Sequence, residues 1–234
     1  MTCLPHLAGL FIKIGQVLSS RPDFIPPIYV ECFSTLQDEA PGWPGLQSRA
    51  IIEHSLKTVH GLTFEEVFAS FEDKPIGSAS IGQVHSATLS QEFLKIARKG
   101  GYAGGETIAI KVMHLDAKDR FRNDLKIFKW LCRVTLPGWG SMLREFEKQI
   151  MTEFDYALEA SNLSVIRKNM MNSPFKNRVV VPQPIEEFTT SNVLLMEMLD
   201  GEKLLDSMQE RLSSILNGDE DLVKTILKEK KRSE

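Results

Sequence analysis

Hydrophobic residues in the first third of the chain recur every three to four positions, which is the period of an amphipathic helix. This pattern predicts one helix over residues 7–18, stopped by a run of prolines, and a second helix over residues 45–59. A third, short helix is predicted to follow Thr63, which can act as an N-cap with Glu66 as its capping-box partner, and to run through Phe68. The residues expected to be buried in the second helix are Leu46, Ile51, Ile52, Leu56 and Val59.

From Pro75 onward the period changes to two, which is typical of strands. Apolar and polar positions alternate over residues 84–89 and again over residues 108–113, so we interpret both segments as antiparallel strands. The segment between them, residues 90–106, ends in a glycine-rich run and is predicted to be a flexible hairpin insert.

A long helical zone is predicted over residues 116–171, with a break near Pro137 and Gly138. Its second half carries one apolar stripe, formed by Leu143, Phe146, Ile150, Phe154 and Leu158. Three strands are predicted beyond it, at residues 179–181, 185–188 and 193–198. The tail from Gly218 ends in a charged run that is expected to be solvated.

The composition is that of an ordinary globular protein. The 234 residues are 42% hydrophobic and 25% charged, which is enough for one domain or two small ones. The net charge of −3 provides no broad attraction to nucleic acid, so we predict no nucleic-acid partner. No apolar run reaches the roughly 18 residues that a membrane-spanning helix needs. Residues 1–10 contain no Lys or Arg and therefore show no targeting peptide.

The cysteines and histidines do not form a recognisable metal or disulfide pattern. Cys3, Cys32 and Cys132 lie far apart, and the five histidines are scattered along the chain. An odd number of cysteines without paired spacing argues against a disulfide framework or a zinc site. We therefore predict three reduced thiols and no metal ligands in this chain.

A glycine-containing turn precedes the first predicted strand and reads Gly77-Ser78-Ala79-Ser80-Ile81-Gly82-Gln83-Val84. Glycines in such a turn let backbone N–H groups approach phosphate oxygens without obstruction by a Cβ atom. The turn lacks the Gly-Lys-Ser/Thr ending of a P-loop, and it carries Ala79 where the kinase pattern G-x-G-x-x-G-x-V has its middle glycine. On its own, the turn is better explained as an ordinary hairpin turn.

The second predicted strand contains a lysine among apolar neighbours. Ile108-Ala109-Ile110-Lys111-Val112 matches the V-A-I-K strand, whose lysine pairs with the phosphates of ATP. Leaving this ammonium unpaired would cost desolvation energy, so an anion is expected beside it, unless Lys111 lies on an edge strand and reaches solvent.

A pair of carboxylates could supply that anion. Asp155 and Glu159 are four residues apart on a predicted helix, beside the apolar Phe154 and Leu158. At least one carboxylate is therefore expected to point toward the strands, although acidic residues on helices are usually only solvated.

The last predicted strand resembles a kinase hinge, because residues 193–199 are apolar apart from Glu197 and lead into the polar turn Asp200-Gly201. A plain buried strand is the alternative. The four features nevertheless occur in the order of a protein-kinase N-lobe: glycine loop, strand lysine, helix carboxylate, and apolar strand with a polar exit. Unrelated features would have no reason to follow this order, so the kinase-like interpretation is favoured.

Three longer motifs occur in a fixed order along the chain. They are Lys13-Ile14-Gly15-Gln16 followed by Leu18-Ser19-Ser20-Arg21-Pro22-Asp23, then Ala79-Ser80-Ile81-Gly82-Gln83-Val84-His85, and then Glu153-Phe154-Asp155. These motifs resemble the K-x-G-Q signature, the alanine-rich nucleotide loop and the E-x-D signature of the UbiB (aarF-domain) atypical protein-kinase-like family. The resemblance covers residues 9–206.

The resemblance implies an α+β fold. The chain would hold a protein-kinase-like N-lobe, made of an antiparallel sheet plus a long helix C, with an N-terminal helical extension and with the C-lobe largely absent. The extension would span residues 1–60 and the N-lobe residues 61–206, while residues 207–234 would begin the C-lobe or form a frayed charged tail.

The resemblance also implies a nucleotide site. Lys111 would pair with the nucleotide phosphates and with Glu159, the carboxylate of helix C. The loop over the phosphates would be formed by Gly77, Ser78, Ala79, Ser80, Gly82 and Val84. Glu197 and Leu199 would offer backbone groups to the adenine.

Further residues would regulate access to this site. Lys13, Gly15 and Gln16 would belong to an extension that folds over the active site. There Lys13 would meet Glu153 and Asp155 and restrict the entry of ordinary protein substrates.

The chain departs from the family pattern in three respects. Gly77-Ser78 stands where well-known members have Ala-Ala, and the insert at residues 90–106 is longer than usual. No H-x-D…N or D-F-G motif follows Gly201, so the base and the Mg²⁺ ligands have no candidates here. The sequence is therefore expected to be a truncated member.

In the complete protein the resemblance implies ATP and Mg²⁺ as cofactors, and an ATPase or a phosphoryl transfer directed at small molecules or lipids. Such a protein would support ubiquinone biosynthesis or lipid homeostasis. Its partners would include membrane lipid or isoprenoid-quinone biosynthesis proteins, and its location would be mitochondrial or plastid, peripheral to a membrane. The alternative is a catalytically inactive, pseudokinase-like scaffold that binds a lipid or a partner protein.

Overall fold

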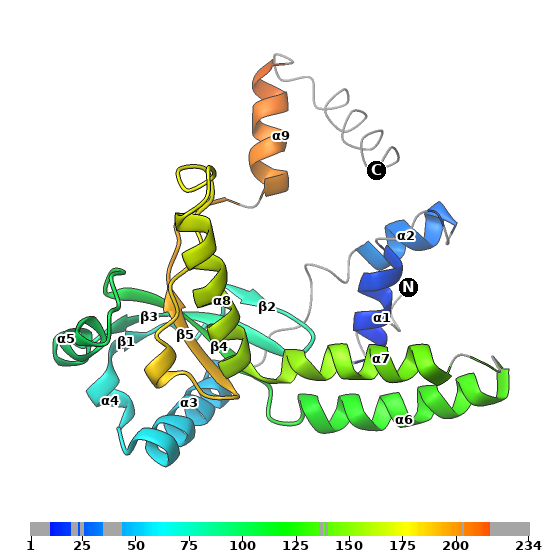
Figure 1. The fold of residues 1–234 in the computed structure, drawn as a ribbon, viewed down its shortest axis with the longest axis horizontal. Helices are drawn as coiled ribbons and strands as arrows, with labels where there is room; N and C mark the ends of the chain where they lie inside the picture. Colours follow the sequence, from blue (N-terminus) through cyan, green and yellow to red (C-terminus); the bar gives the residue numbers. More distant parts are fainter. Residues whose placement is uncertain are drawn as a thin grey trace. The chain divides into compact units, whose positions relative to one another are not determined.

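The computed structural model describes residues 10–19, 23, 26–34, 44–135, 138, 140–202 and 204–215. Contacts divide the chain into two compact units, one ending at Met198 and the other beginning at Leu199, and each is described by itself. The first unit is an antiparallel sheet with helices on both faces (Figure 1).

The sheet is five-stranded and consists of β1 (Phe68–Phe71), β2 (Gly77–Ser78), β3 (Gly82–Leu89), β4 (Thr107–Met113) and β5 (Val193–Glu197). The strand order is β1-β3-β4-β5, β2 also pairs with β3, and all of these pairs are antiparallel. The register sets Val84 opposite Lys111, and Lys111 opposite Leu194. The strands predicted around residues 84–89 and 108–113 are thus confirmed.

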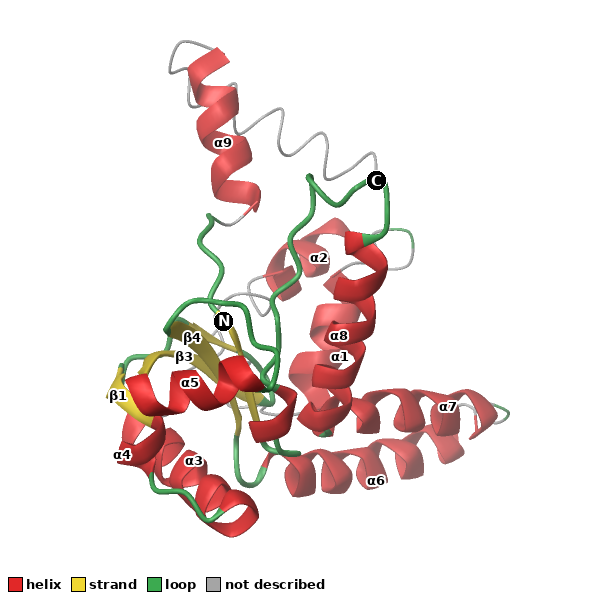
Figure 2. Ribbon diagram, turned by 60° about the vertical axis from the view of Figure 1, so that its left-hand side comes forward, coloured by secondary structure: helices red, strands yellow, loops and turns green. Residues whose placement is uncertain are grey.

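One face of the sheet is covered by α3 (Gly45–His60), α4 (Phe64–Val67) and α5 (Gln91–Lys99). Figure 2 shows these helices gathered on the same side of the strands. Their apolar side chains pack on alternate strand positions and form a core that includes Ile52, Leu56, Phe93, Ile108, Ile110, Val112 and Leu195. The capping box predicted for Thr63 and Glu66 begins α4 and is confirmed.

The opposite face is covered by α8 (Tyr156–Met171), by the 3-10 helix η3 (Thr152–Phe154) and by α6 (Ala117–Thr135) and α7 (Gly140–Met151), which form a helical hairpin. The second core includes Leu10, Met113, Phe121, Leu125, Phe154, Tyr156 and Leu194. Because successive strand residues point to opposite faces, Lys111 lies on the α8 side while Ile110 and Val112 lie on the α3 side.

The N-terminal helices are α1 (Leu10–Ser19) and α2 (Pro27–Ser34). The helix predicted over residues 7–18 is confirmed from Leu10, while residues 7–9 lie outside the described residues. α2 was not predicted, because its prolines suggested only a stop. Pro27 instead begins the helix, at the one place where a missing N–H costs nothing.

The predicted burial of two residues of α3 is wrong. Leu46 and Val59 were expected in the core, but their side chains are exposed, whereas Ile51, Ile52 and Leu56 are buried as predicted. The helix presents only its central turns to the sheet, so apolar residues near its two ends remain in solvent.

The insert at residues 90–106 is not a plain flexible hairpin. Ser90 caps α5 by accepting a hydrogen bond from the N–H of Phe93, at 3.1 Å from its Oγ. α5 then buries Phe93, Leu94 and Ala97, which lie at helical spacing. The glycine run that follows predicted a flexible insert, and the short amphipathic segment before it was therefore not recognised as a helix.

The helical zone at residues 116–171 is broken near residue 138 as predicted, and it is broken again at η3. Asp155 has extended backbone angles there, and its carboxylate accepts hydrogen bonds from the N–H groups of Ala157 and Leu158 at 3.1 and 3.3 Å. The stripe predicted from Leu143 to Leu158 therefore does not continue, and Leu158 is exposed.

The strands predicted at residues 179–181 and 185–188 are wrong. The first segment forms no regular element, and the second is mostly the 3-10 helix η4 (Glu186–Phe188). Between them a single bridge joins Pro184 to Met196 on β5. Proline cannot donate the ladder hydrogen bond that would extend this bridge into a strand. The strand predicted at 193–198 is confirmed as β5.

The second unit contributes α9 (Leu204–Ile215) to the described residues. The charged tail predicted from Gly218 lies outside the described residues.

Candidate functional site

Lys111 and Glu159 are brought together across the interface between β4 and α8. The ammonium Nζ lies 2.8 Å from both carboxylate oxygens of Glu159. The two side chains are 26% and 37% exposed, so the pair is accessible from outside. A bidentate contact of this kind holds the lysine at a defined point above the sheet.

Tyr156, which the sequence interpretation missed, lies beneath this pair. The Lys111 Nζ atom is 4.7 Å from the centroid of the Tyr156 ring, within the range of a cation–π contact. Tyr156 is completely buried, and its hydroxyl has no hydrogen-bond partner among the described residues. Burial raises the pKa of this hydroxyl, and the neighbouring carboxylates of Glu159 and Glu153 raise it further. A sequence signal did exist, because Tyr156 is three residues before Glu159 on one helix face.

The glycine turn lies between β2 and β3 and is folded back on itself. Gly77 is opposite Val84 in the β2–β3 pair, and the N–H of Ala79 donates to the carbonyl of Gly82 at 2.8 Å. Ser78 and Ser80 are partly exposed and Ala79 is exposed. The predicted loop residues therefore form one compact turn beside Lys111.

Gly82 occupies a position where no larger residue fits. A Cβ atom there would lie 2.5 Å from the carbonyl oxygen of Val112 and 2.5 Å from the hydroxyl of Tyr156. The backbone carbonyl cannot move aside easily, so the close approach of β3 and β4 requires glycine. Around Gly77, by contrast, a Cβ atom would meet open space.

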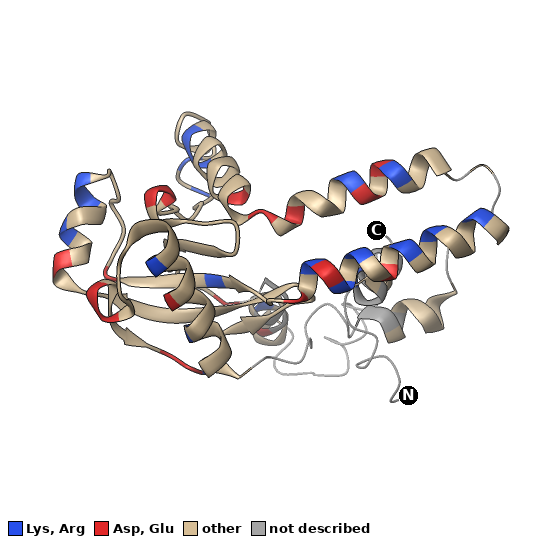
Figure 3. Ribbon diagram, turned by 90° about the horizontal axis from the view of Figure 1, so that it is seen from below, with Lys and Arg blue, Asp and Glu red and all other residues tan. Residues whose placement is uncertain are grey.

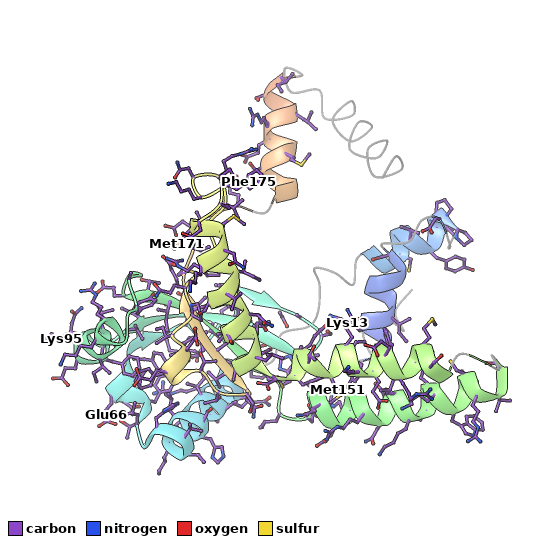
Figure 4. The ribbon with its side chains drawn as sticks, viewed as in Figure 1. Lys13, Glu66, Lys95, Met151, Met171 and Phe175 are labelled. Carbon is purple, nitrogen blue, oxygen red and sulfur yellow. The ribbon has the colours of Figure 1, made fainter. Side chains whose placement is uncertain are left out.

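Lys13 reaches the same region from α1. Its Nζ donates to Oε2 of Glu153 at 2.7 Å, over 140 residues of sequence. Figure 4 shows Lys13 on the side of α1 that faces the end of α7 near Met151. Gly15 is buried in α1, and the Gln16 side chain lies outside the described residues.

Asp155 does not share the role predicted for it beside Lys13. Its carboxylate accepts from two backbone N–H groups at the start of α8 and so serves as the N-cap of that helix. Of the E-x-D motif, Glu153 meets Lys13 and Asp155 positions the helix that carries Glu159.

The proposed hinge is held by a polar network. The carboxylate of Glu197 accepts hydrogen bonds from Arg167 at 2.9 Å and from the backbone N–H of Gln183 at 3.0 Å. The backbone N–H of Glu197 is already occupied, because it donates to the carbonyl of Gln183 at 2.8 Å. The backbone group of Glu197 that could contact an adenine is therefore its carbonyl. Leu199 belongs to the second unit, where it is exposed.

A second feature that the sequence interpretation missed is a buried polar chain behind the glycine turn. The Gln83 amide nitrogen lies 2.8 Å from Oγ of Ser48 and 2.9 Å from Nε2 of His85. The other ring nitrogen of His85 lies 2.8 Å from the carbonyl oxygen of Glu72. Because that carbonyl can only accept, Nδ1 of His85 donates to it and Nε2 accepts from Gln83, which describes a neutral imidazole.

This arrangement predicts an acid-sensitive fold. Burial lowers the pKa of His85 below its ordinary value of 6.5, and burial also lowers the pKa of His114. Below pH 6.5 the unfolded chain binds more protons than the folded chain. The free energy of unfolding therefore rises with pH in that range and decreases as the pH falls. Urea titrations should show this loss, with a slope of up to about 1.4 kcal/mol per pH unit for each such histidine.

The matched variant for this measurement is His85→Gln, whose amide can accept from Gln83 but does not titrate. Its acid slope should be shallower than that of the wild-type chain, with the contribution of His114 remaining. Equal slopes in the two proteins would show that His85 is not the titrating group.

The described residues contain no group of three or more His, Cys, Asp or Glu side chains placed to hold a metal ion. Lys111 and the glycine turn fit an anionic phosphate, whereas these residues do not fit a Mg²⁺ ion, which prefers several oxygen ligands. Among the described helices, none is long and apolar enough to cross a membrane.

Comparisons with known proteins agree with this geometry. A sequence profile described as the ABC1 atypical kinase-like domain matches residues 35–230. The chain is 31% identical over 211 residues to a probable protein kinase UbiB from Marinobacter nauticus, a match that covers 87% of this chain and 35% of the relative. It is 34% identical over 215 residues to an uncharacterized protein from Synechocystis, with 87% and 34% coverage. The chain thus spans about a third of the length of these curated relatives.

A solved structure is also similar to this chain in fold. The complex of Rv3197 with erythromycin from Mycobacterium tuberculosis is similar to this chain with a TM-score of 0.53 and 28% sequence identity, covering 89% of this chain and 49% of the other. The prediction of an α+β, kinase-like N-lobe with an antiparallel sheet is confirmed.

Proposed function

Because the chain belongs to the ABC1 atypical kinase-like family, we propose that it binds ATP on the α8 side of its sheet, with Lys111 contacting the phosphates. The observation that carries the proposal is the contact of Lys111 Nζ with both oxygens of Glu159 at 2.8 Å. In kinases a strand lysine held in this way by a helix carboxylate pairs with the α- and β-phosphates. The pair is partly exposed, so a ligand can reach it.

The glycine turn supplies the second half of the proposed phosphate site. Gly77, Ser78, Ala79 and Ser80 form its exposed rim, and Gly82 lets β3 approach β4 closely enough to bring the rim beside Lys111. Backbone N–H groups of such turns can donate to phosphate oxygens. The carbonyl of Glu197 would contact the adenine, while the adenine contact of Leu199 stays a prediction from the family resemblance.

In the complete protein we propose that ATP bound here is hydrolysed, or that its phosphoryl group is transferred to a small molecule or lipid. Support for ubiquinone biosynthesis or lipid homeostasis, and a mitochondrial or plastid location at a membrane surface, stay predictions from the family resemblance. Mg²⁺ would neutralise the phosphates when bound, but the described residues offer no carboxylate cluster for it, so this chain's own contribution is to position the nucleotide.

The contact between Lys13 and Glu153 supports a restricted site. It ties α1 to η3, immediately before the helix that carries Glu159. We propose that α1 limits the entry of a folded protein substrate and leaves room for smaller acceptors. Membrane lipids or quinone-biosynthesis proteins would then be the partners of the complete protein.

The second candidate function is a scaffold without catalysis. It is favoured because the described residues contain no cluster of three or more His, Cys, Asp or Glu side chains that could hold a metal ion. A scaffold would bind a lipid or a protein partner and would have no need for a strand lysine paired with a helix carboxylate. The two functions therefore differ in whether nucleotide is bound.

Titration calorimetry of the full 234-residue chain with ATP, ADP and AMP, with and without magnesium, tests the proposal. We expect saturable binding of ATP and ADP, and AMP should bind at least about tenfold more weakly because it lacks the β-phosphate that Lys111 would contact. Equal affinities for AMP and ATP would contradict the proposed phosphate site. Absence of binding by all three nucleotides would favour the scaffold.

A further inference from the structure

The two halves of α8 are held to the rest of the unit in different ways. In this helix, which the structure describes along its whole length, the buried residues are Tyr156 and Ala160, and no residue after Ala160 is buried. Val165 and Met171 in the second half are 56% and 63% exposed. Apolar packing therefore fixes the half that carries Glu159, whereas the second half depends on polar contacts.

Arg167 makes the strongest of these polar contacts. Its Nη1 atom donates to the carboxylate of Glu197 at 2.9 Å and to the carbonyl oxygen of Val181. The side chains of Arg167 and Glu197 are only 26% and 21% exposed, so solvent screens their attraction only in part. Ser164 also donates to Glu186 of η4, but that contact is exposed. A hydrogen bond between two ionised groups is roughly twice as strong as a neutral one, so Arg167 is the main anchor of this half.

The carboxylate that Arg167 binds is itself fixed in place. Glu197 belongs to β5, which pairs with β4 on one side. On the other side its backbone N–H donates to the carbonyl of Gln183 at 2.8 Å, and its carboxylate accepts from the N–H of Gln183 at 3.0 Å. The side chain of Gln183 in turn binds the carbonyl of Gly101 and the N–H of Ala103, each at 2.9 Å. Arg167 therefore ties the second half of α8 to a firmly held end of the sheet.

α8 thus forms two ion pairs with the sheet. Its charged residues are Glu159 in the first turn, and Arg167 and Lys168 near its end (Figure 3). Glu159 and Arg167 are eight residues apart, which places them about 12 Å apart along the helix axis and about 80° apart around it. Contacts at two heights and in two directions fix both the tilt and the rotation of a helix. The position of Glu159 beside Lys111 should therefore depend on Arg167.

We propose that Arg167 is a positioning residue of the nucleotide site, and that its pair with Glu197 holds α8 in the orientation in which Glu159 contacts Lys111. A rotation of the helix by about 20° would move a carboxylate that lies about 6 Å from the axis by about 2 Å, which is enough to break a hydrogen bond. Lys111 would then lose the carboxylate that places it for a phosphate. For its effect on nucleotide binding, this inference rests on the proposed function.

Titration calorimetry of the full chain with ATP tests the role of Arg167. Arg167→Met should raise the Kd for ATP by about 3- to 10-fold, because α8 would hold Glu159 in place in only about a tenth to a third of the molecules. Arg167→Lys keeps a cation that can reach Glu197, so its Kd should stay within about twofold of the wild-type value. The matched control is Lys168→Met, which removes the same charge from the next, exposed position of α8 and should also stay within about twofold.

A double variant shows whether Arg167 acts through Lys111. In Lys111→Ala the cation that Glu159 places is absent, so adding Arg167→Met should change the Kd for ATP by less than about twofold. If Arg167 acted instead on the end of β5 beside an adenine, or only on overall stability, the losses from the two substitutions would multiply. Multiplied losses would therefore overturn the proposal.

Hydrogen exchange of the nucleotide-free chain provides a second test. In Arg167→Met the backbone amides of residues 163–171 should exchange at least about tenfold faster than in the wild-type chain, whereas those of α3 should be unchanged. Methionine leaves the Glu197 carboxylate unpaired, so the measurement is repeated with Arg167→Met/Glu197→Gln, whose new amide still accepts from Gln183. Circular dichroism should show both variants folded.

The outcomes separate this inference from the proposed function. Unchanged exchange in both variants would overturn the anchoring role of Arg167, whatever the affinity for ATP. Faster exchange with an unchanged Kd for ATP would overturn its positioning role. Absence of ATP binding by the wild-type chain would instead contradict the proposed function, and the exchange rates would still decide whether Arg167 anchors α8.

Discussion

Replacing Lys111 with alanine is expected to raise the Kd of this chain for ATP by roughly 10- to 100-fold. The ammonium is the cation that the geometry offers to the phosphates, and it is held in place by both oxygens of Glu159 at 2.8 Å. Alanine removes this cation and also leaves the Glu159 carboxylate facing the phosphates, where it repels them. Titration calorimetry on the full chain measures the change.

Two comparisons make the Lys111→Ala result specific. Lys95→Ala removes an exposed lysine from α5 and should leave the Kd for ATP unchanged. Lys111→Ala should change the affinity for AMP much less than the affinity for ATP, because AMP lacks the β- and γ-phosphates. If the variant loses ATP and AMP affinity equally, Lys111 does not act through the β-phosphate.

The fold should tolerate this substitution. The side chains of the Lys111–Glu159 pair are 26% and 37% exposed, and such pairs contribute little to stability, in the range of about 0 to 1 kcal/mol. A urea titration of Lys111→Ala should therefore show a folded protein with nearly wild-type stability. A large loss of stability would mean that the change in Kd reflects unfolding.

Replacing Tyr156 with alanine is expected to lower the free energy of unfolding by about 3 to 5 kcal/mol. The side chain is completely buried in the core between the sheet and α8, in the same cluster as Phe154, Phe121 and Leu194. Alanine would leave a cavity against Gly82 and remove the ring beneath Lys111. Urea unfolding followed by circular dichroism measures the loss.

Tyr156→Phe should behave in the opposite way. The hydroxyl has no hydrogen-bond partner in the part of the chain that the structure describes, and an unsatisfied buried polar group costs about 1 to 3 kcal/mol. Phenylalanine keeps the ring and removes that cost, so the variant should be at least as stable as the wild-type chain. It should also keep the cation–π contact with Lys111 and hence the affinity for ATP.

The control for Tyr156 is Phe175→Ala, which truncates an exposed aromatic residue in the turn after α8 (Figure 4). Its effect on stability should stay within about 0.5 kcal/mol. A loss of more than about 1 kcal/mol in Tyr156→Phe would show that the hydroxyl has a partner after all.

Elements with a strong local signal could be predicted from the sequence. The capping box at Thr63 and the alternation around Ser86 and Ile110 depend on neighbouring residues only, and these elements formed as expected. The failures occurred where local signals competed. Glycines near the end of the 90–106 insert concealed α5, and a continuous apolar stripe concealed the break at Asp155.

The exposed ends of α3 and the lost strand at residues 179–181 have a common cause. Burial of Leu46 or Val59 depends on how far the sheet extends beneath the helix, and strand formation at Val180 depends on a neighbour with free hydrogen-bonding groups. The local sequence pattern determines neither condition, because both depend on residues that are distant in sequence.

By itself, the sequence determined the order of the glycine turn, the strand lysine, the helix carboxylate and the K-x-G-Q and E-x-D motifs, because each depends on residue type and local spacing. Only the tertiary structure decided which of these groups meet. It set Lys111 against Glu159, assigned Glu153 to Lys13 and Asp155 to the helix N-cap, and buried Tyr156 beneath the lysine. It also left Ile127, Trp130, Leu131 and Val134 of α6 exposed. Such contacts depend on chain folding over tens of residues, which no local pattern specifies.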